Sequence, residues 1–150
     1  MNDQSPRPRP PVPQRAHFPH IVRDIIRYAD LDPQGHVNNA KFATYLETGR
    51  VAMFRNPDLG IGVPNATFVL VRQEIDFLRE LRWPGDIDVG TALVELGRSS
   101  VVLAQAIFQG EACAADGRAT LVMLDTITRR ARPLVPEMIA KLNQWKYRGP

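Results

Sequence analysis

The sequence predicts an α+β fold in which an antiparallel sheet packs one face against a single long helix. Residues 38–56 carry apolar side chains at helical spacing, whereas segments after residue 67 alternate and are separated by turn residues, which is typical of antiparallel strands. The length of 150 residues and the hydrophobic content of 44% suit one globular domain with a sizeable core.

The chain begins with a segment, residues 1–19, that is dense in proline and arginine and poor in large apolar residues. We expect this tail to be disordered. Residues 10–15 fit the proline-rich pattern that aromatic-lined grooves bind, although a solvated extension explains the same composition. From Ile21 the chain alternates enough to form a strand to Tyr28, and residues 32–35 have turn chemistry.

A helix should follow that turn, with Asn38 or Asn39 as its N-cap. Asn-Pro-Asp at residues 56–58, together with Gly60 and Gly62, ends the helix and opens a loop to about residue 66. The helical apolar stripe predicts the face that meets the core, namely Phe42, Tyr45, Leu46, Gly49 and Met53.

Four strands are expected after the loop. The first spans residues 67–78 and has one wetter face, which carries Arg72, Glu74 and Asp76. The next two span residues 87–96 and 101–108, and the last lies within residues 112–128. Turns are expected at residues 82–86, 97–100 and 109–111, although residues 116–117 could supply the last turn instead. A short helix over residues 137–146 closes the chain.

Composition limits the function classes. The net charge of +3 comes from dispersed Arg and Lys residues, which do not demand nucleic acid and would equally suit a ligand with several phosphates. The one cysteine, Cys113, cannot form an internal disulfide, and no His or Cys cluster has the spacing of a zinc site. No apolar run is long enough for a signal peptide or a membrane span, so we expect a metal-free cytoplasmic protein.

Residues 27–47 are the most informative part of the chain, because a turn rich in acids runs directly into the start of the helix. The first backbone N–H groups of a helix have no partner within it and favour negative charge. A carboxylate beside them suits chemistry in which a negative oxygen develops, and acyl transfer is the obvious example.

Residues 30–39, Asp-x-Asp-Pro-x-Gly-His-Val-Asn-Asn, and Tyr-Leu-Glu at residues 45–47 resemble the hotdog-fold acyl-CoA thioesterases of the 4-hydroxybenzoyl-CoA thioesterase type. The resemblance extends through the Trp-Pro-Gly-Asp and Arg-Ser-Ser turns and covers residues 20–150. It implies a sheet wrapped around a central helix and hydrolysis of an acyl-CoA thioester to a carboxylic acid and coenzyme A, without a cofactor. It also implies a homodimer or homotetramer in which sheets join edge to edge, with active sites between subunits.

The resemblance places the catalytic carboxylate at Asp32, which acts as a nucleophile on the thioester carbonyl or as a general base on water. The developing oxyanion would then meet the helix N-terminus near Asn39. The alternative for Asp32 is a turn residue that hydrogen-bonds its own backbone. Asp30 is expected to be solvated or paired with an arginine. Tyr28 matches a tyrosine beside the catalytic acid of some relatives, or is a half-buried strand residue.

His36 either relays a proton or orients the carbonyl, and the alternative is a packed histidine. Some relatives carry their histidine where this chain has Asn39. Helix capping alone would explain both Asn38 and Asn39, while the Asn39 N–H is also a candidate oxyanion donor. We expect Glu47 to form a buried structural pair, with Arg50 or with the acidic loop, rather than to act as the helix carboxylate that another branch of hotdog thioesterases uses.

Two polar groups are candidates for binding the phosphates of coenzyme A, and the alternatives are a solvated turn and a solvated tail. Their members, in a turn between strands and in a basic cluster after the last strand, are Arg98, Ser99, Ser100, Arg129, Arg130 and Arg132. Two other functions stay open. One is hydration or dehydration of an acyl thioester, for which related enzymes space their Asp and His differently from Asp32 and His36. The other is a non-catalytic module that binds acyl thioesters and recruits a partner through its proline-rich tail.

Overall fold

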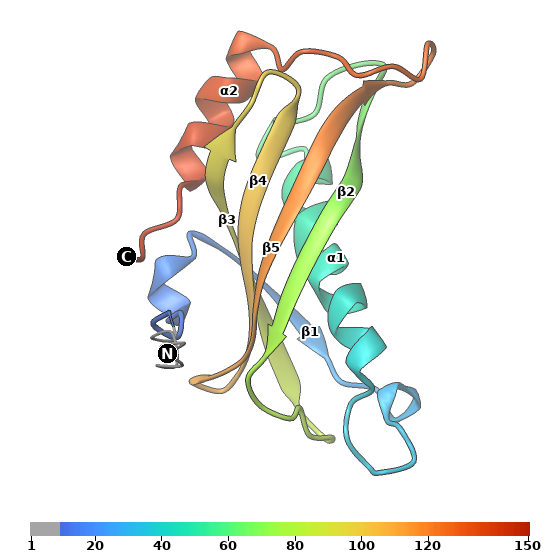
Figure 1. The fold of residues 1–150 in the computed structure, drawn as a ribbon, viewed down its shortest axis with the longest axis vertical. Coiled ribbons are helices and arrows are strands. Elements are labelled where there is room, and N and C mark those ends of the chain that lie inside the picture. The colour runs from blue at the N-terminus through green and yellow to red at the C-terminus, as the bar shows by residue number, and fades with distance from the viewer. Residues whose placement is uncertain (1–9) are drawn as a thin grey trace, which may run out of the picture.

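A computed structural model describes residues 10–150 and confirms the α+β class. Five antiparallel strands in the order β1-β3-β4-β5-β2 form one sheet, which curves around the long helix α1 (Figure 1). The strands are β1 (His20–Ile25), β2 (Ala66–Phe77), β3 (Asp86–Leu96), β4 (Ser100–Gln109) and β5 (Ala112–Asp125). The helices are α1 (Asn39–Arg55) and α2 (Pro136–Leu142), and short 3-10 turns span η1 (Arg15–His17), η2 (Tyr28–Asp30) and η3 (Asn143–Trp145).

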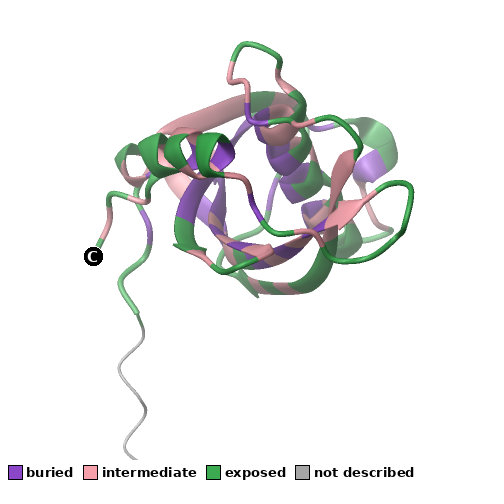
Figure 2. Cartoon of the chain, turned by 90° about the horizontal axis from the view of Figure 1, so that it is seen from above, coloured by how far each residue is buried: buried purple, intermediate pink, exposed green. Residues whose placement is uncertain are grey.

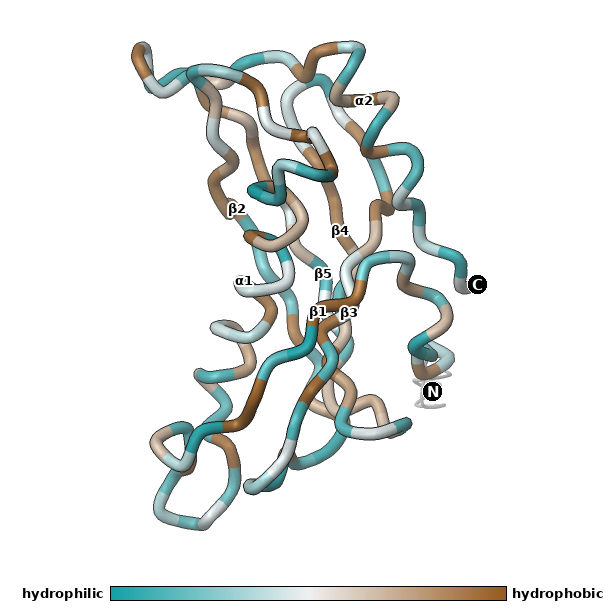
Figure 3. Tube along the Cα trace, turned by 180° about the vertical axis from the view of Figure 1, so that it is seen from behind, coloured by the Kyte–Doolittle hydropathy of each residue, from teal (hydrophilic) through white to brown (hydrophobic). Residues whose placement is uncertain are grey.

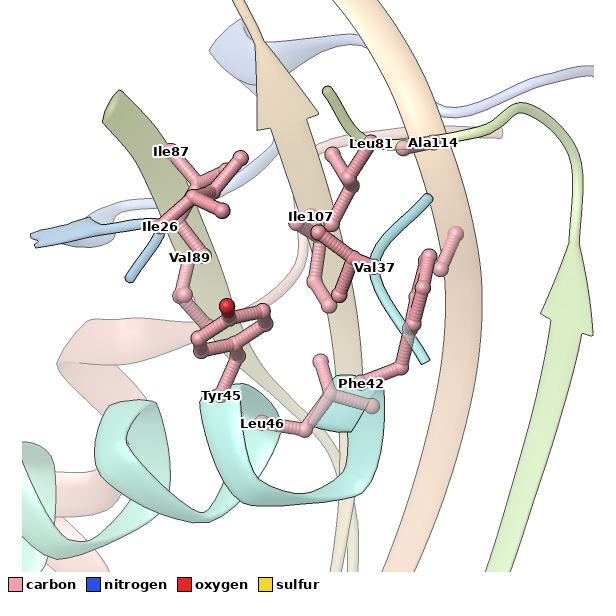
Figure 4. Close-up of a cluster of buried hydrophobic side chains, with 11 residues drawn as sticks. Ile26, Val37, Phe42, Tyr45, Leu46, Leu81, Ile87, Val89, Ile107 and Ala114 are labelled. Atoms are coloured by element: carbon pink, nitrogen blue, oxygen red, sulfur yellow. The ribbon is translucent and has the colours of Figure 1, made fainter. Parts of the chain in front are cut away.

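The apolar stripe of α1 meets the concave face of the sheet, as the sequence predicts. Phe42, Tyr45 and Leu46 are buried, and Figure 4 shows them among Val89 and Ile107 from the strands. A second buried cluster continues along the helix past Met53 and ends against α2. Viewed from above, the buried residues lie where α1 and the sheet face each other (Figure 2). Full burial of one such side chain contributes about 1.5–3 kcal/mol, so the contact of the helix with the sheet contributes substantially to stability.

Gly49 lets α1 approach the sheet closely. A Cβ atom at this position would lie 2.7 Å from Cγ1 of Val89 and 2.9 Å from Oγ1 of Thr91, both on β3. Distances this short are not tolerated between packed atoms, so a larger residue would push the helix away. The glycine is therefore a packing requirement of the helix–sheet interface.

Two element ends differ from the prediction. β1 ends at Ile25 rather than at Tyr28, because residues 28–30 form η2, in which the Asp30 carboxylate accepts a hydrogen bond from the Arg27 amide at 2.9 Å. α2 ends at Leu142 rather than near residue 146 and passes into η3. The expected turn at residues 109–111 is confirmed, with Gly110 in the left-handed region at φ 60°.

The packed domain also begins earlier than the sequence predicted. Residues 15–17 form η1, and Phe18 is only 4% exposed. Phe18 packs on the outer face of the sheet, where a Cβ atom at Gly90 would lie 2.6 Å from its ring. Residues 15–19 therefore belong to the domain. Residues 1–9 of the expected tail lie outside the described residues. Within the described part of the chain, no helix is both long enough and apolar enough to cross a membrane.

Candidate functional site

The loop between η2 and α1 is closed at its base by two backbone contacts. Leu31 and Val37 form an antiparallel bridge, and the Asn38 amide donates to the Asp30 carbonyl oxygen at 2.9 Å. These contacts fix residues 32–36 as a compact projection at the lower end of the molecule in Figure 1. The candidate catalytic residue is therefore held by the loop itself rather than by the helix.

The Asp32 carboxylate lies in this projection. Its Oδ1 accepts hydrogen bonds from the Gln34 amide at 2.9 Å and from the His36 amide at 3.3 Å, while Gly35 completes the turn at φ 82°. Its Oδ2 makes no hydrogen bond within residues 10–150. The side chain thus has the self-bonded turn geometry that the sequence allowed, and it keeps one oxygen available for a substrate. No hydrogen bond between described residues joins this carboxylate to the start of α1.

Asp30, two residues earlier, is the buried acid of the pair at 5% exposure. Its Oδ2 accepts a hydrogen bond from the Tyr45 hydroxyl at 2.6 Å as well as from the Arg27 amide, and the Lys41 ammonium lies 3.7 Å from its Oδ1. The expectation that Asp30 is solvated or paired with arginine is therefore wrong. Burial alone would raise its pKa, but the hydroxyl, the amide and the nearby cations outweigh burial and lower the pKa. Burial, together with the same contact, raises the pKa of Tyr45.

Asn38 is the N-cap of α1. Its Oδ1 accepts a hydrogen bond from the Ala40 amide at 2.9 Å, and its carbonyl oxygen accepts one from the Lys41 amide at 2.8 Å. Asn39 is the first helical residue and is exposed. The capping function predicted for this pair therefore falls on Asn38, and it leaves the exposed helix N-terminus beside Asn39 as the candidate oxyanion site.

Tyr28 and His36 do not contact the Asp32 carboxylate through their side chains. Tyr28 is 72% exposed and lies in η2, so it is not a half-buried strand residue; its ring packs edge-on against Trp83 with 5.2 Å between ring centroids. His36 places its Nε2 3.3 Å from Oε2 of Glu80. Only the backbone of His36 reaches Asp32, so the structure shows no Asp–His dyad within the described chain.

The prediction that Glu47 forms a buried structural pair is wrong. Glu47 is exposed on α1 and forms no ion pair within residues 10–150, so it is not a buried structural partner. Arg50 is buried instead and donates to Oε1 of Gln105 at 2.9 Å. The oxygen next to the guanidinium thus comes from a neutral amide on β4, while Glu47 lies at the surface. Glu47 lies at the edge of a groove of about 610 Å³ between α1 and β2.

The two groups predicted to bind coenzyme A phosphates lie together at one end of the molecule. The Ser99 carbonyl accepts from the Met123 amide of β5 at 2.8 Å, and the Arg98 carbonyl accepts from the Leu134 amide at 2.9 Å, so the turn of residues 97–100 is joined to β5 and to the segment that follows it. That segment holds Arg129 and Arg130 in an exposed turn, and Ser100 begins β4.

Within one chain, this basic end is far from Asp32. Figures 1 and 3 show the loop of residues 31–38 at the lower end and the turns at residues 97–100 and 126–131 at the upper end, with the length of α1 between them. A helix of 17 residues spans about 25 Å at 1.5 Å per residue. The structure therefore does not bring the predicted catalytic and phosphate-binding residues together in a single chain.

Cys113 and the acidic side chains offer no second reactive centre. Cys113 is buried, its thiol donates to the Ala115 carbonyl oxygen at 3.3 Å, and burial with the nearby Asp116 raises its pKa to about 11. A thiol this hard to ionise is a poor nucleophile. Among residues 10–150, no three His, Cys, Asp or Glu side chains gather closely enough to hold a metal ion.

Comparison with known proteins identifies the family. Residues 26–142 match the model of the thioesterase-like superfamily. The chain is 31% identical over 124 residues to the long-chain acyl-CoA thioesterase FadM of Escherichia coli strain K12, a match that covers 79% of this chain and 93% of that protein. It is 34% identical to a thioesterase of Thermus thermophilus solved in complex with coenzyme A and Zn, with a TM-score of 0.74 over 85% of this chain and 94% of that one.

A solved protein of Pseudomonas aeruginosa strain PAO1 shares the fold at a TM-score of 0.84 and 24% identity, covering 93% of this chain and 100% of that one. The sheet that curves around one long helix is thus the hotdog fold that the sequence predicted. Because the family match spans residues 26–142 and the likeness to FadM extends over 79% of the chain, the chain belongs to the thioesterase-like superfamily and is a hotdog-fold thioesterase.

Proposed function

We propose that this thioesterase hydrolyses acyl-CoA thioesters to a carboxylic acid and coenzyme A, with Asp32 as the catalytic carboxylate. The observation that carries the proposal is the state of Asp32: Oδ1 is held by two backbone amides, and Oδ2 has no partner within the described chain. The names of FadM and of the coenzyme A-bound Thermus thermophilus thioesterase support the substrate class.

Asp32 has two possible roles. As a nucleophile, its Oδ2 attacks the thioester carbonyl carbon, coenzyme A leaves as the thiolate, and water then cleaves the acyl-aspartyl anhydride. As a general base, the carboxylate takes a proton from water, the hydroxide adds to the carbonyl carbon, and the thiolate leaves with that proton. A thiol with a free pKa of about 8.5 needs no strong acid to leave. The exposed helix N-terminus beside Asn39 would stabilise the oxyanion in either route.

In this proposal a second copy of the chain completes the site. Asp32 and the basic cluster of Arg98, Ser99, Ser100, Arg129 and Arg130 lie at opposite ends of one molecule, so one substrate spanning both needs two subunits. We propose a homodimer, with a homotetramer as the alternative. The edge of β2 supports this assembly, because within residues 10–150 β2 pairs only with β5, and it exposes Leu70 and Val71. An unpaired strand edge is a template for pairing with another chain.

Two other functions receive less support. Hydration or dehydration of an acyl thioester needs an Asp and a His that act together, but the His36 imidazole lies against Glu80 rather than against Asp32. A non-catalytic thioester-binding module on the same fold would bind acyl-CoA without turnover, which the assay below tests. The cytoplasmic location and the absence of a cofactor stay predictions.

The test is thiol release from short, long and aromatic acyl-CoAs by the purified full-length protein and by Asp32→Asn. We expect hydrolysis of at least one substrate and a fall of about a hundredfold or more in kcat/KM for Asp32→Asn, because the carboxylate enters the reaction directly. Asp58→Asn, a change of the same kind at an exposed loop position, is the matched control. No release from any substrate would contradict the proposed reaction, and full activity in Asp32→Asn would contradict the assigned residue.

A further inference from the structure

Asp30 is attached to α1 at two points. Its carbonyl oxygen accepts a hydrogen bond from the Asn38 amide at 2.9 Å, and its Oδ2 accepts one from the Tyr45 hydroxyl at 2.6 Å. Asn38 is the N-cap of the helix, and Tyr45 lies about 10 Å further along the helix axis. A segment that is bound to a rigid helix at one point can pivot about it, whereas two separated points fix its orientation. Asp30 therefore fixes the direction in which the chain enters the loop of residues 31–38.

The contact between the Asp30 and Tyr45 side chains is strong and lies inside one subunit. Both side chains are almost fully buried, and the lowered pKa of Asp30 keeps its carboxylate ionised near neutral pH. Hydrogen bonds to an ionised group are shorter and stronger than neutral ones, and a buried setting strengthens them further. Because neither side chain is on the surface, a second subunit would leave this contact unchanged.

The position of Asp32 depends on this attachment. Asp32 follows Asp30 by two residues, and its Oδ1 binds two backbone amides of the same loop. No hydrogen bond between described residues joins its carboxylate to α1. The Val37 amide donates to the Leu81 carbonyl oxygen at 3.3 Å, which joins the loop to the segment before β3 and not to the helix. The distance between the Asp32 carboxylate and the helix N-terminus is therefore set by the two contacts of Asp30 and by the chain that connects the loop to the helix.

We propose that Asp30 is a positioning residue: through the Tyr45 hydroxyl it holds the loop in one orientation on α1 and so fixes the distance between the Asp32 carboxylate and the helix N-terminus. Catalysis depends steeply on such distances, because a displacement of about 1 Å can lower a rate by about a hundredfold. The inference rests on the proposed function in one respect, since a rate reports the position of Asp32 only if Asp32 takes part in catalysis.

The first test measures the loop itself, by ¹⁵N relaxation of the full-length protein. Tyr45→Phe removes only the hydroxyl and keeps the buried ring. We expect the backbone order parameters of Gln34 and His36 to fall from about 0.85, typical of a rigid backbone, toward about 0.6 in this variant. Those of β4 should stay as in the wild type, because order parameters describe the folded state and do not follow a loss of overall stability. Unchanged order parameters in the loop would overturn the proposal.

The second test is the rate of thiol release. We expect kcat to fall by about tenfold in Tyr45→Phe and in Asp30→Ala, with KM within about twofold of wild type, because a misplaced carboxylate slows the chemical step without changing substrate binding. The double variant should be about as slow as the slower single variant, since both changes remove the same contact. Asp30→Asn should keep more of kcat than Asp30→Ala. The Arg27 amide and the Tyr45 hydroxyl both donate to Oδ2, and the carbonyl oxygen of asparagine can accept both bonds.

The matched control is Tyr147→Phe, which removes the same group from a residue packed on Phe18 at the outer face of the sheet, where the hydroxyl lies 3.1 Å from Nδ1 of His17. It should leave the order parameters of the loop and kcat unchanged. A loosened loop with unchanged kcat, or additive losses in the double variant, would overturn this inference and leave the proposed reaction standing. No thiol release by the wild type would overturn the proposed reaction, and the order parameters would then still decide whether Asp30 holds the loop.

Discussion

Asp30 and Asp32 are separated by one residue and lie in opposite surroundings. Asp30 is buried beneath the start of α1 and joins η2 to the helix through the Tyr45 hydroxyl at 2.6 Å. Asp32 lies in the projecting loop, where backbone amides bind one of its oxygens. Asp30 therefore holds the loop to the helix, whereas Asp32 keeps one oxygen available for a substrate.

The sequence contains one signal for the Asp30 contact, which is Tyr45 itself. Tyr45 belongs to the apolar stripe of the helix, and a tyrosine buried on such a stripe needs a partner for its hydroxyl. Which acid meets it depends on how residues 28–38 fold back, and no local pattern encodes that path. The turn chemistry of Asp32 is local, so it could be predicted; the partner of Asp30 is 15 residues away and could not.

We predict that Asp30→Asn lowers the free energy of unfolding by about 1.5–3 kcal/mol near neutral pH, because the substitution removes the buried charge that strengthens the hydrogen bonds to this side chain. The pKa of Asp30 is lowered in the folded chain, so the ionised group stabilises the fold fully above its unfolded pKa of about 3.9. That stabilisation is lost as the pH falls through the lower folded pKa. The difference in the free energy of unfolding between wild type and Asp30→Asn should therefore shrink toward acid pH.

Urea unfolding in steps from about pH 7 to about pH 3 measures this difference in the free energy of unfolding. Asp58→Asn removes a carboxylate from an exposed loop and should leave the stability within about 0.5 kcal/mol of wild type throughout. A difference that stays constant over the whole pH range would contradict the assignment, because it would show that the charge of Asp30 contributes nothing.

At the scale of elements, the contact of α1 with the sheet rests on one close approach at Gly49. We predict that Gly49→Ala destabilises the protein by about 1 kcal/mol, although alanine favours the helix by about the same amount over glycine. The gain is outweighed because the new methyl group would lie 2.7 Å from Val89 and overpacking of a core costs about 1–3 kcal/mol. Thr44→Ala, on the exposed face of the same helix, should raise the stability slightly. Thermal unfolding compares the two, and a stabilised Gly49→Ala would contradict the packing argument.

Periodicity explains which elements could be predicted. The stripe of α1 and the alternation of the later strands repeat over ten or more residues, so α1 and these strands could be located from local sequence. Phe18 has no such repeat around it. It lies at the end of a proline-rich segment, and its binding site is created by small residues such as Gly90 and Ala92 on the outer face of the sheet. That site exists only once the sheet has formed, which is why the sequence placed the domain boundary too late.

At the scale of the whole molecule, the separation of Asp32 from the basic cluster makes a prediction about assembly. If a homodimer combines Asp32 of one chain with the basic end of the other, two inactive variants should complement each other. Asp32→Asn lacks the carboxylate, and the triple variant Arg98→Gln/Arg129→Gln/Arg130→Gln lacks the charges. A mixed dimer of these two chains contains one intact site and one site with both defects. We expect it to show about half the activity of the wild-type dimer.

The mixed dimer is obtained by co-expressing the two variants with different affinity tags and purifying on both, and thiol release is compared with each parent variant. The control is a mixed dimer of wild type with a chain that carries all four substitutions. Its two sites each have one defect, so complementation cannot restore either of them. If instead every site were built within a single chain, the pattern would reverse: the wild-type subunit would keep half the activity in the control, and the complementing pair would stay inactive. The two mixed dimers contain the same residues in different combinations, so their order of activity reports whether the substrate spans two subunits.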